Sequence, residues 1–76
     1  MDRDEMRKNI RENLIELRIK KGITQTELAK KIGKSANAVA SWEQGLSLPD
    51  VTMLYRLAAY YGKLMEYFYE NHKEEL

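Results

Sequence analysis

Four glycines divide this chain into short segments, and each follows a stretch with the apolar spacing of an α-helix. They are Gly22, Gly33, Gly45 and Gly62. A glycine adopts a left-handed backbone without a Cβ penalty, so this pattern predicts a helix end at each one. Lys, Glu, Leu, Ala and Arg dominate the 76 residues, a composition that favours helices over strands. We therefore expect one small all-α domain of five helices.

The first two segments carry clear helix signals. Ile10, Leu14 and Leu17 share one helical face before Gly22. The next segment opens with TQTE at residues 24–27, which is typical of a capping box, where a threonine hydroxyl and a glutamate carboxylate each bind an unpaired backbone N–H. We expect this second helix to end at Gly33, and its predicted buried residues are Leu28, Ala29 and Ile32.

The remaining segments predict three more helices. Ser35 is a good N-cap for a third helix that ends near Gln44, so only about three residues separate it from the second. Pro49 cannot continue a helix, which places the fourth at about 51–61, with Leu54, Leu57, Ala58 and Tyr61 as its core face. A fifth helix is expected after Gly62, and its apolar positions are Leu64, Met65, Tyr67, Phe68 and Tyr69.

The third helix contains mostly small side chains, SANAVASWEQG at residues 35–45. At 100° per residue, Val39 and Trp42 face inward, with Glu43 at the edge of that face. A helix exposed only for solubility usually carries Lys and Glu on its outer face. Here the side chains on that face are short and uncharged, which indicates close approach to another molecule. The face consists of Asn37, Ser41 and Gln44 with Ala36 and Ala40 beside them.

Two helices joined by a short turn with a glycine are typical of a helix-turn-helix, whose second helix enters the DNA major groove. Residues 10–69 resemble the helix-turn-helix domain of the Cro/C1 phage-repressor type, the XRE family. The resemblance rests on the run LRIKKGITQTELAKKIGKSANAVASWEQG and on LPDVTMLYRLAAYYG after it. It implies a lambda-repressor-like five-helix bundle in a DNA-binding domain over residues 1–71, followed by a polar tail at 72–76.

The resemblance also implies a DNA-binding surface. Asn37 and Ser41 would read base edges, and Ala36 or Ala40 would contact a thymine methyl group. Phosphates would meet the N-terminus of the second helix, although Gln25 there is also explained as an ordinary exposed residue. The full predicted set is Thr24, Gln25, Lys34, Ser35, Ala36, Asn37, Ala40, Ser41 and Gln44. Because these side chains are mostly small, we expect DNA shape to carry part of the specificity.

Two further positions follow from the resemblance. Arg18 matches a family arginine late in the first helix that pairs with the glutamate at Glu43, and such a pair would hold the third helix against the first. Leu64 stands where the family usually has a Ser or Thr cap, which leaves the start and packing of the fifth helix open.

Net charge is only +1, but residues 1–45 carry ten Lys or Arg against seven Asp or Glu, which favours the first half for an anionic partner. Scattered surface charge explains the same numbers. The chain has no cysteine, and neither a signal peptide nor a membrane span is indicated, so a cytoplasmic location is expected. We find no catalytic constellation, metal site, cofactor motif or small-molecule ligand site, and we expect His72 to lie in the solvated tail.

Two expectations concern partners. We expect a homodimer through the C-terminal half on an operator of double-stranded DNA, because one domain with so small a reading face contacts few bases. The surplus apolar residues for that interface are Tyr60, Leu64, Tyr67 and Tyr69, unless the aromatic side chains fold back onto the monomer's own core. The alternative function is a protein-interaction module of the same fold, such as an antitoxin or a partner-binding regulator.

Overall fold

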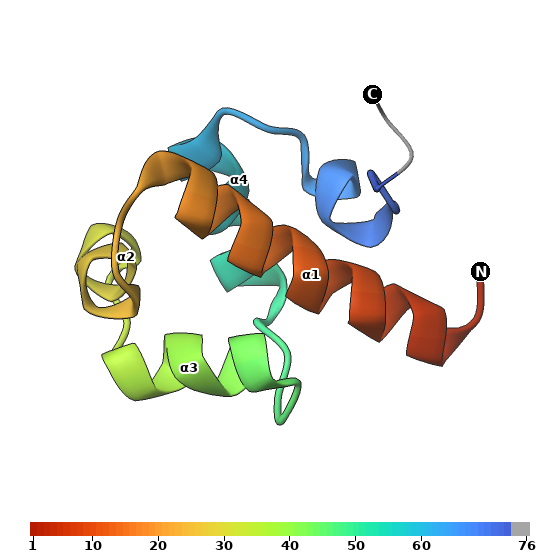
Figure 1. Ribbon diagram of the computed structural model, residues 1–76, viewed down its shortest axis with the longest axis horizontal. Coiled ribbons are helices and arrows are strands. Elements are labelled where there is room, and N and C mark those ends of the chain that lie inside the picture. The colour runs from red at the N-terminus through yellow and green to blue at the C-terminus, as the bar shows by residue number, and fades with distance from the viewer. Residues whose placement is uncertain (74–76) are drawn as a thin grey trace.

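The computed structural model describes residues 1–73 of the chain. Within them are four α-helices, one short 3-10 helix and no strand, which confirms the all-α class. The elements are α1 (Arg3–Lys21), α2 (Gln25–Ile32), α3 (Ala36–Gln44), α4 (Val51–Tyr61) and η1 (Met65–Tyr69). Figure 1 shows α1 as the long central helix, with α3 on one side of it and η1 on the other, while α2 and α4 lie toward its C-terminal end.

Helix ends lie where the capping signals predict them. The four glycines have φ between 67° and 79° and end α1 to α4. The capping box of Thr24 and Glu27 is present, and the Ser35 hydroxyl accepts from the backbone N–H of Ala38. Asp50 opens α4 in the same way, through the N–H of Met53. These helices therefore begin and end on contacts within a few residues of chain.

One hydrophobic cluster joins all five elements. Every apolar residue predicted to face inward in α1, α2 and α3 is buried, and Met53 of α4 joins the core although the sequence did not single it out. Tyr61 and Met65 are only half-buried at the margin of the cluster. The core comprises Ile10, Leu14, Leu17, Leu28, Ala29, Ile32, Val39, Trp42, Met53, Leu54, Leu57, Ala58 and Phe68.

The prediction of a fifth α-helix is wrong, because the residues after Gly62 form only the five-residue 3-10 helix η1. Leu64 stands at its N-cap position and has no side-chain oxygen to accept a backbone N–H. Two asparagines of α1 also bind the carbonyls of this segment. Asn13 Nδ2 lies 2.8–3.0 Å from the carbonyl oxygens of Tyr67, Phe68 and Glu70.

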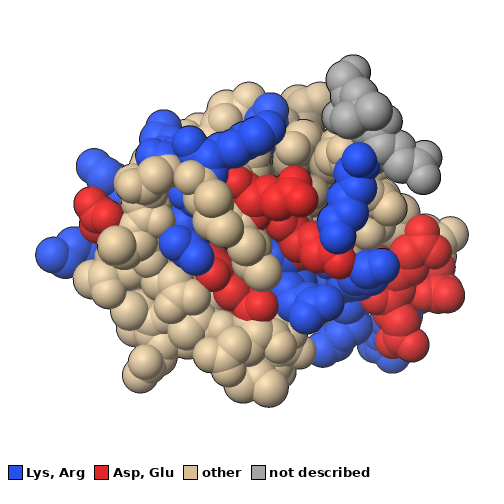
Figure 2. All heavy atoms as spheres, viewed as in Figure 1, with Lys and Arg blue, Asp and Glu red and all other residues tan. Residues whose placement is uncertain are grey.

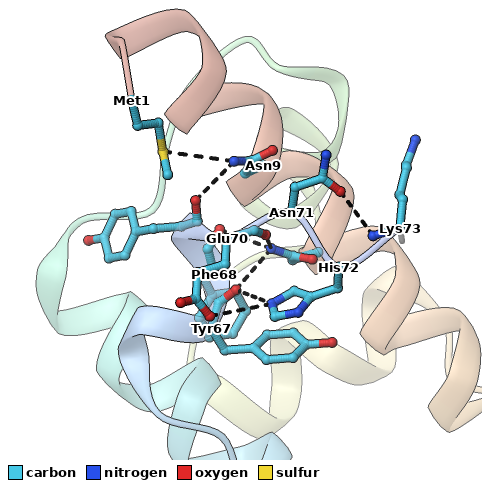
Figure 3. A network of polar contacts seen from close by, with 10 residues as sticks. Met1, Asn9, Tyr67, Phe68, Glu70, Asn71, His72 and Lys73 are labelled. Atoms are coloured by element: carbon cyan, nitrogen blue, oxygen red, sulfur yellow. Dashed lines mark hydrogen bonds and ion pairs between the residues drawn. The ribbon is translucent and has the colours of Figure 1, made fainter. Parts of the chain in front are cut away.

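Asn9 repeats this contact one turn earlier in α1. Its Nδ2 donates to the carbonyl of Tyr69 at 2.9 Å, as Figure 3 shows. Both asparagines are buried, at 4% and 3% exposure. The backbone carbonyls of residues 67–70 accept hydrogen bonds from these two side chains, so they do not need the backbone hydrogen bonds of an α-helix. Tertiary contacts therefore hold this segment.

His72 also belongs to this segment, so the prediction that it is a plain surface residue is wrong. Its imidazole stacks on the Tyr67 ring with centroids 3.8 Å apart, and Nε2 lies 2.8 Å from the Tyr67 carbonyl oxygen (Figure 3). Its side chain is only 9% exposed. Lys73 continues the attachment with an ion pair to Glu12 of α1 at 2.8 Å. Residues 74–76, the rest of the predicted tail, lie outside the described residues.

Candidate nucleic-acid interface

The outer face of α3 is uncharged and accessible. Asn37 and Gln44 are exposed, whereas Ala36, Ala40 and Ser41 are half-buried between them. Figure 2 shows that the edge of the molecule over α3 is formed by side chains other than Lys, Arg, Asp and Glu. The structure therefore places five of the nine predicted site residues on one helix face.

Ser41 does not stand alone on this face. Its hydroxyl lies 2.7 Å from that of Ser47, in the loop that follows α3. Either oxygen can donate, and each hydroxyl keeps further hydrogen-bonding capacity for a base or a phosphate. The contact ties the loop to the outer face, so residues beyond Gln44 adjoin the candidate surface.

An ion pair holds α3 against α1, as predicted. Arg18 Nε donates to Glu43 Oε2 at 2.7 Å, and its NH2 group donates to Oε1 at 3.0 Å. The other terminal nitrogen of Arg18 donates to the Ile23 carbonyl at 2.9 Å, in the turn between α1 and α2. The hydrogen bond to Glu43 raises the pKa of Arg18 above its ordinary value. Such a two-point pair fixes direction as well as distance.

Gln25 adds a third bond to the same carboxylate, which the sequence did not reveal. Its side-chain nitrogen donates to Glu43 Oε1 at 2.9 Å, and the residue is half-buried. Glu43 itself is only 9% exposed. Because one carboxylate binds side chains from α1 and α2, the orientation of α3 relative to both helices is set by Glu43. The only sequence signal for this was a glutamate at the edge of an inward face.

The start of α2 lies beside this network. The Thr24 hydroxyl accepts the N–H of Glu27 at 3.0 Å, and Glu27 Oε1 accepts the N–H of Thr24 at 2.9 Å. That bond to the Thr24 backbone lowers the pKa of Glu27. The first-turn amides of Gln25 and Thr26 have no intrahelical acceptor, so they are the groups available to a phosphate. Lys34 and Ser35, both exposed, lie in the following turn at the other end of α2.

Residues 1–73, which the structure describes, bring no three His, Asp or Glu side chains together in a way that could hold a metal ion. No helix in the same range has the length and apolar character to cross a membrane. The uncharged outer face of α3, held by Glu43, is thus the feature that the fold presents most distinctly.

A short helix bound to a preceding helix across a tight turn, with its outer face exposed, defines a helix-turn-helix protein. The family model described as helix-turn-helix matches residues 14–68. The chain belongs to this family, of the XRE type.

Two curated relatives agree with the family assignment. A protein of Archaeoglobus fulgidus named uncharacterized HTH-type transcriptional regulator is 33% identical over 67 residues, covering 88% of this chain and 96% of that protein. Sinorhizobium fredii has an uncharacterized HTH-type transcriptional regulator, y4dJ, that is 40% identical over 58 residues, covering 76% of this chain and 75% of the relative. No solved structure gives a significant match. Together these similarities support a DNA-binding regulator.

Proposed function

We propose that this protein is a transcriptional regulator that binds a specific site in double-stranded DNA with α3 in the major groove. The observation that carries the proposal is the uncharged outer face of α3, held by the bonds of Glu43 to Arg18 and Gln25. A reading helix has to be rigidly placed, because base contacts depend on fractions of an ångström. A small domain bound at an operator can act by excluding other proteins from that DNA, so we propose a repressor that acts in the cytoplasm.

Within this proposal the site residues have distinct roles. Asn37 reads a base edge, and the pairing of an Asn amide with adenine N6 and N7 is the best geometric match. Ser41 lies on the same face and reads a second base. Ala36 and Ala40 accept a thymine methyl group. Backbone phosphates are contacted at the ends of the surface, and the residues proposed for them are Thr24, Gln25, Lys34, Ser35 and Gln44.

We also propose a two-fold dimer, with half-sites about one DNA turn, ~34 Å, apart. Three of the four residues expected at the interface from the sequence, Tyr60, Tyr67 and Tyr69, are half-buried against the monomer core, so we propose other exposed apolar residues for it. Leu64 is 74% exposed, and Val51 and Tyr55, one turn apart on α4, are 68% and 65% exposed. Tyr55 and Leu64 line one hollow together with Ala58 and Ala59, and an exposed apolar surface of this kind supports an interface along α4 and Leu64.

The proposal is tested with the base-reading residue. Selection of bound sequences from a random duplex pool should yield one motif. Asn37→Ala should then weaken binding to that site by ~1–3 kcal/mol and relax preference at one position of each half-site, without changing the melting temperature. Asn71→Ala, the same change at an exposed position of the C-terminal segment, is the matched control. Equal binding by Asn37→Ala and the parent would contradict the role of α3.

A second candidate function is binding of a partner protein, as in an antitoxin. The low net charge of +1 and the uncharged α3 face favour it, because neither attracts DNA electrostatically. Ionic strength separates the two functions. Neutralisation of phosphates makes binding to random duplex fall steeply with salt, whereas a protein that binds only other proteins shows no such slope.

A further inference from the structure

Three cations of α1 lie beside the C-terminal end of α3. Arg7, Lys8 and Arg11 line a shallow hollow together with Asp4, Gln44 and Gly45. A Cβ atom on Gly45 would stand 3.3 Å from Arg11 Cδ, so the glycine lets the arginine lie closely across the end of α3. Figure 2 shows Lys and Arg side chains gathered between the uncharged edge over α3 and a group of Asp and Glu side chains at the N-terminal end of α1.

The end of α3 needs these charges if an anion is to approach it. A helix C-terminus carries a partial negative charge that repels phosphate. The last turn of α3 contains no basic residue. Arg7 and Lys8 are exposed, and Arg11 is half-buried. Asp4 in the lining offsets one of the three charges. Glu12 lies near Lys8 and Arg11 but is itself paired with Lys73, so an excess of positive charge remains at the hollow.

The position of the hollow relates it to DNA. A major groove roughly 12 Å wide admits an α-helix, and the two phosphate backbones border the groove. With α3 in the groove, a hollow lined by Gln44 at the C-terminal end of α3 and by Gly45 lies beside one border of the groove. Lys34 precedes the N-terminal end of α3, whereas Arg7, Lys8 and Arg11 lie beside its C-terminal end. The two ends of α3 therefore each have cations close by for phosphate.

We propose that Arg7, Lys8 and Arg11 form a binding site for backbone phosphate of the DNA strand that passes the C-terminal end of α3. The site rests on the proposed function and adds an element of α1 to the DNA-binding surface. It supplies affinity without reading sequence, since phosphate contacts position a protein on the duplex and base contacts specify the site. An alternative role for these cations is to stabilise the end of α3 in the free protein.

The test measures binding of the parent and of R7Q/K8Q/R11Q to a fluorescently labelled duplex carrying the selected site, across a potassium chloride series. Each phosphate contact contributes about 0.9 to the slope of log affinity against log salt, so the slope should fall by about 2 to 3 for each bound domain. The ranking of the selected site over single-base variants should not change. The matched control is K20Q/K30Q/K31Q, which removes three exposed charges that do not line the hollow.

Folding is monitored separately, because Arg11 touches Gly45. R7Q/K8Q leaves that contact intact and should still lower the slope by about 1 to 2. A triple variant with the slope of the parent, or a control that loses as much, would overturn the phosphate site while the proposed function stands. If R7Q/K8Q/R11Q lowers the melting temperature but leaves the salt slope unchanged, the three cations stabilise the end of α3 and do not bind phosphate. A parent that binds no duplex would contradict the proposed function, and the site with it.

Discussion

The helix-turn-helix and the segment at 64–73 are built by different means. In the first, α2 and α3 begin at Thr24 and Ser35, whose side chains cap them, and end at glycines. In the second, η1 begins at Leu64 without a side-chain cap and ends in extended backbone at Glu70. Hydrogen bonds from the asparagines of α1, which lie up to 60 positions away in the sequence, hold this segment. One region is organised by near neighbours in sequence and the other by distant ones.

This difference matters for function. The reading helix is fixed by local caps and by the bonds of Glu43, so it should keep its geometry when distant parts of the chain are disturbed. The C-terminal segment closes the core through Phe68 and should detach before the helix-turn-helix unfolds. Four substitutions test that ordering, from the largest expected effect to the smallest.

The largest effect is expected at Phe68, which is fully buried at 0% exposure. Phe68→Ala leaves a cavity under α1 and α4, and we expect it to lower the free energy of unfolding by ~3–5 kcal/mol. Urea denaturation measures this loss. Tyr69→Ala, at the half-buried neighbour, is the control and should cost clearly less. If the two losses were equal, Phe68 would not be the residue that attaches the segment.

Glu43 should come next, because removing it strands Arg18 and Gln25. We expect Glu43→Ala to cost about 3 kcal/mol of stability. A double-mutant cycle with Arg18→Ala should show a coupling of about 1–3 kcal/mol. The Glu12 and Lys73 pair serves as the comparison, since their side chains are 23% and 56% exposed, and its coupling should be much weaker. No coupling between Arg18 and Glu43 would mean that the caps and the buried side chains Val39 and Trp42 hold α3 without the ion pair.

A smaller loss is expected at Asn13, whose side chain binds three carbonyls of the C-terminal segment. Asn13→Ala should cost about 2 kcal/mol, because those carbonyls lose a buried donor. Asn9→Ala removes one such bond and should cost less. Amide hydrogen exchange should accelerate at residues 65–70 and remain slow in α3. Equal acceleration in α3 would show that the two regions unfold as one unit.

The smallest effect concerns the hydroxyl of Tyr61, which is buried without a hydrogen-bond partner among the described residues. Tyr61→Phe removes an unsatisfied group, so stability should rise by up to about 1 kcal/mol at neutral pH. Burial, with a contribution from Tyr60, raises the pKa of Tyr61 to about 12.

The raised pKa of Tyr61 also predicts a pH dependence. The raised pKa favours the folded state fully below pH ~10, where the phenol of the unfolded chain is still protonated. This contribution to the free energy of unfolding declines toward pH ~12, because the phenol ionises in the unfolded state before it ionises in the folded state. Stability should therefore fall less for Tyr61→Phe than for the parent between about pH 10 and about pH 12. Identical declines in urea titrations would mean that the hydroxyl is solvated.

The sequence by itself determined the helix ends, the inner faces of α1 to α3, the capping box and the outer face of α3. These features depend on residues within about one turn of each other, where spacing and side-chain type are sufficient. The pairing of Arg18 with Glu43 also came from the sequence, although only through the family resemblance. The roles of Asn37 and the other DNA-binding residues remain predictions.

Tertiary structure alone decided the form of the C-terminal segment and the surroundings of Glu43. Asn9 and Asn13 lie beside the buried stripe of α1, but their partners are carbonyls more than fifty positions away, which no local pattern identifies. Gln25 reaches Glu43, and Arg11 lies against Gly45, only because α1, α2 and α3 pack together. Local chemistry sets where a helix begins and ends, whereas packing sets which distant side chains meet.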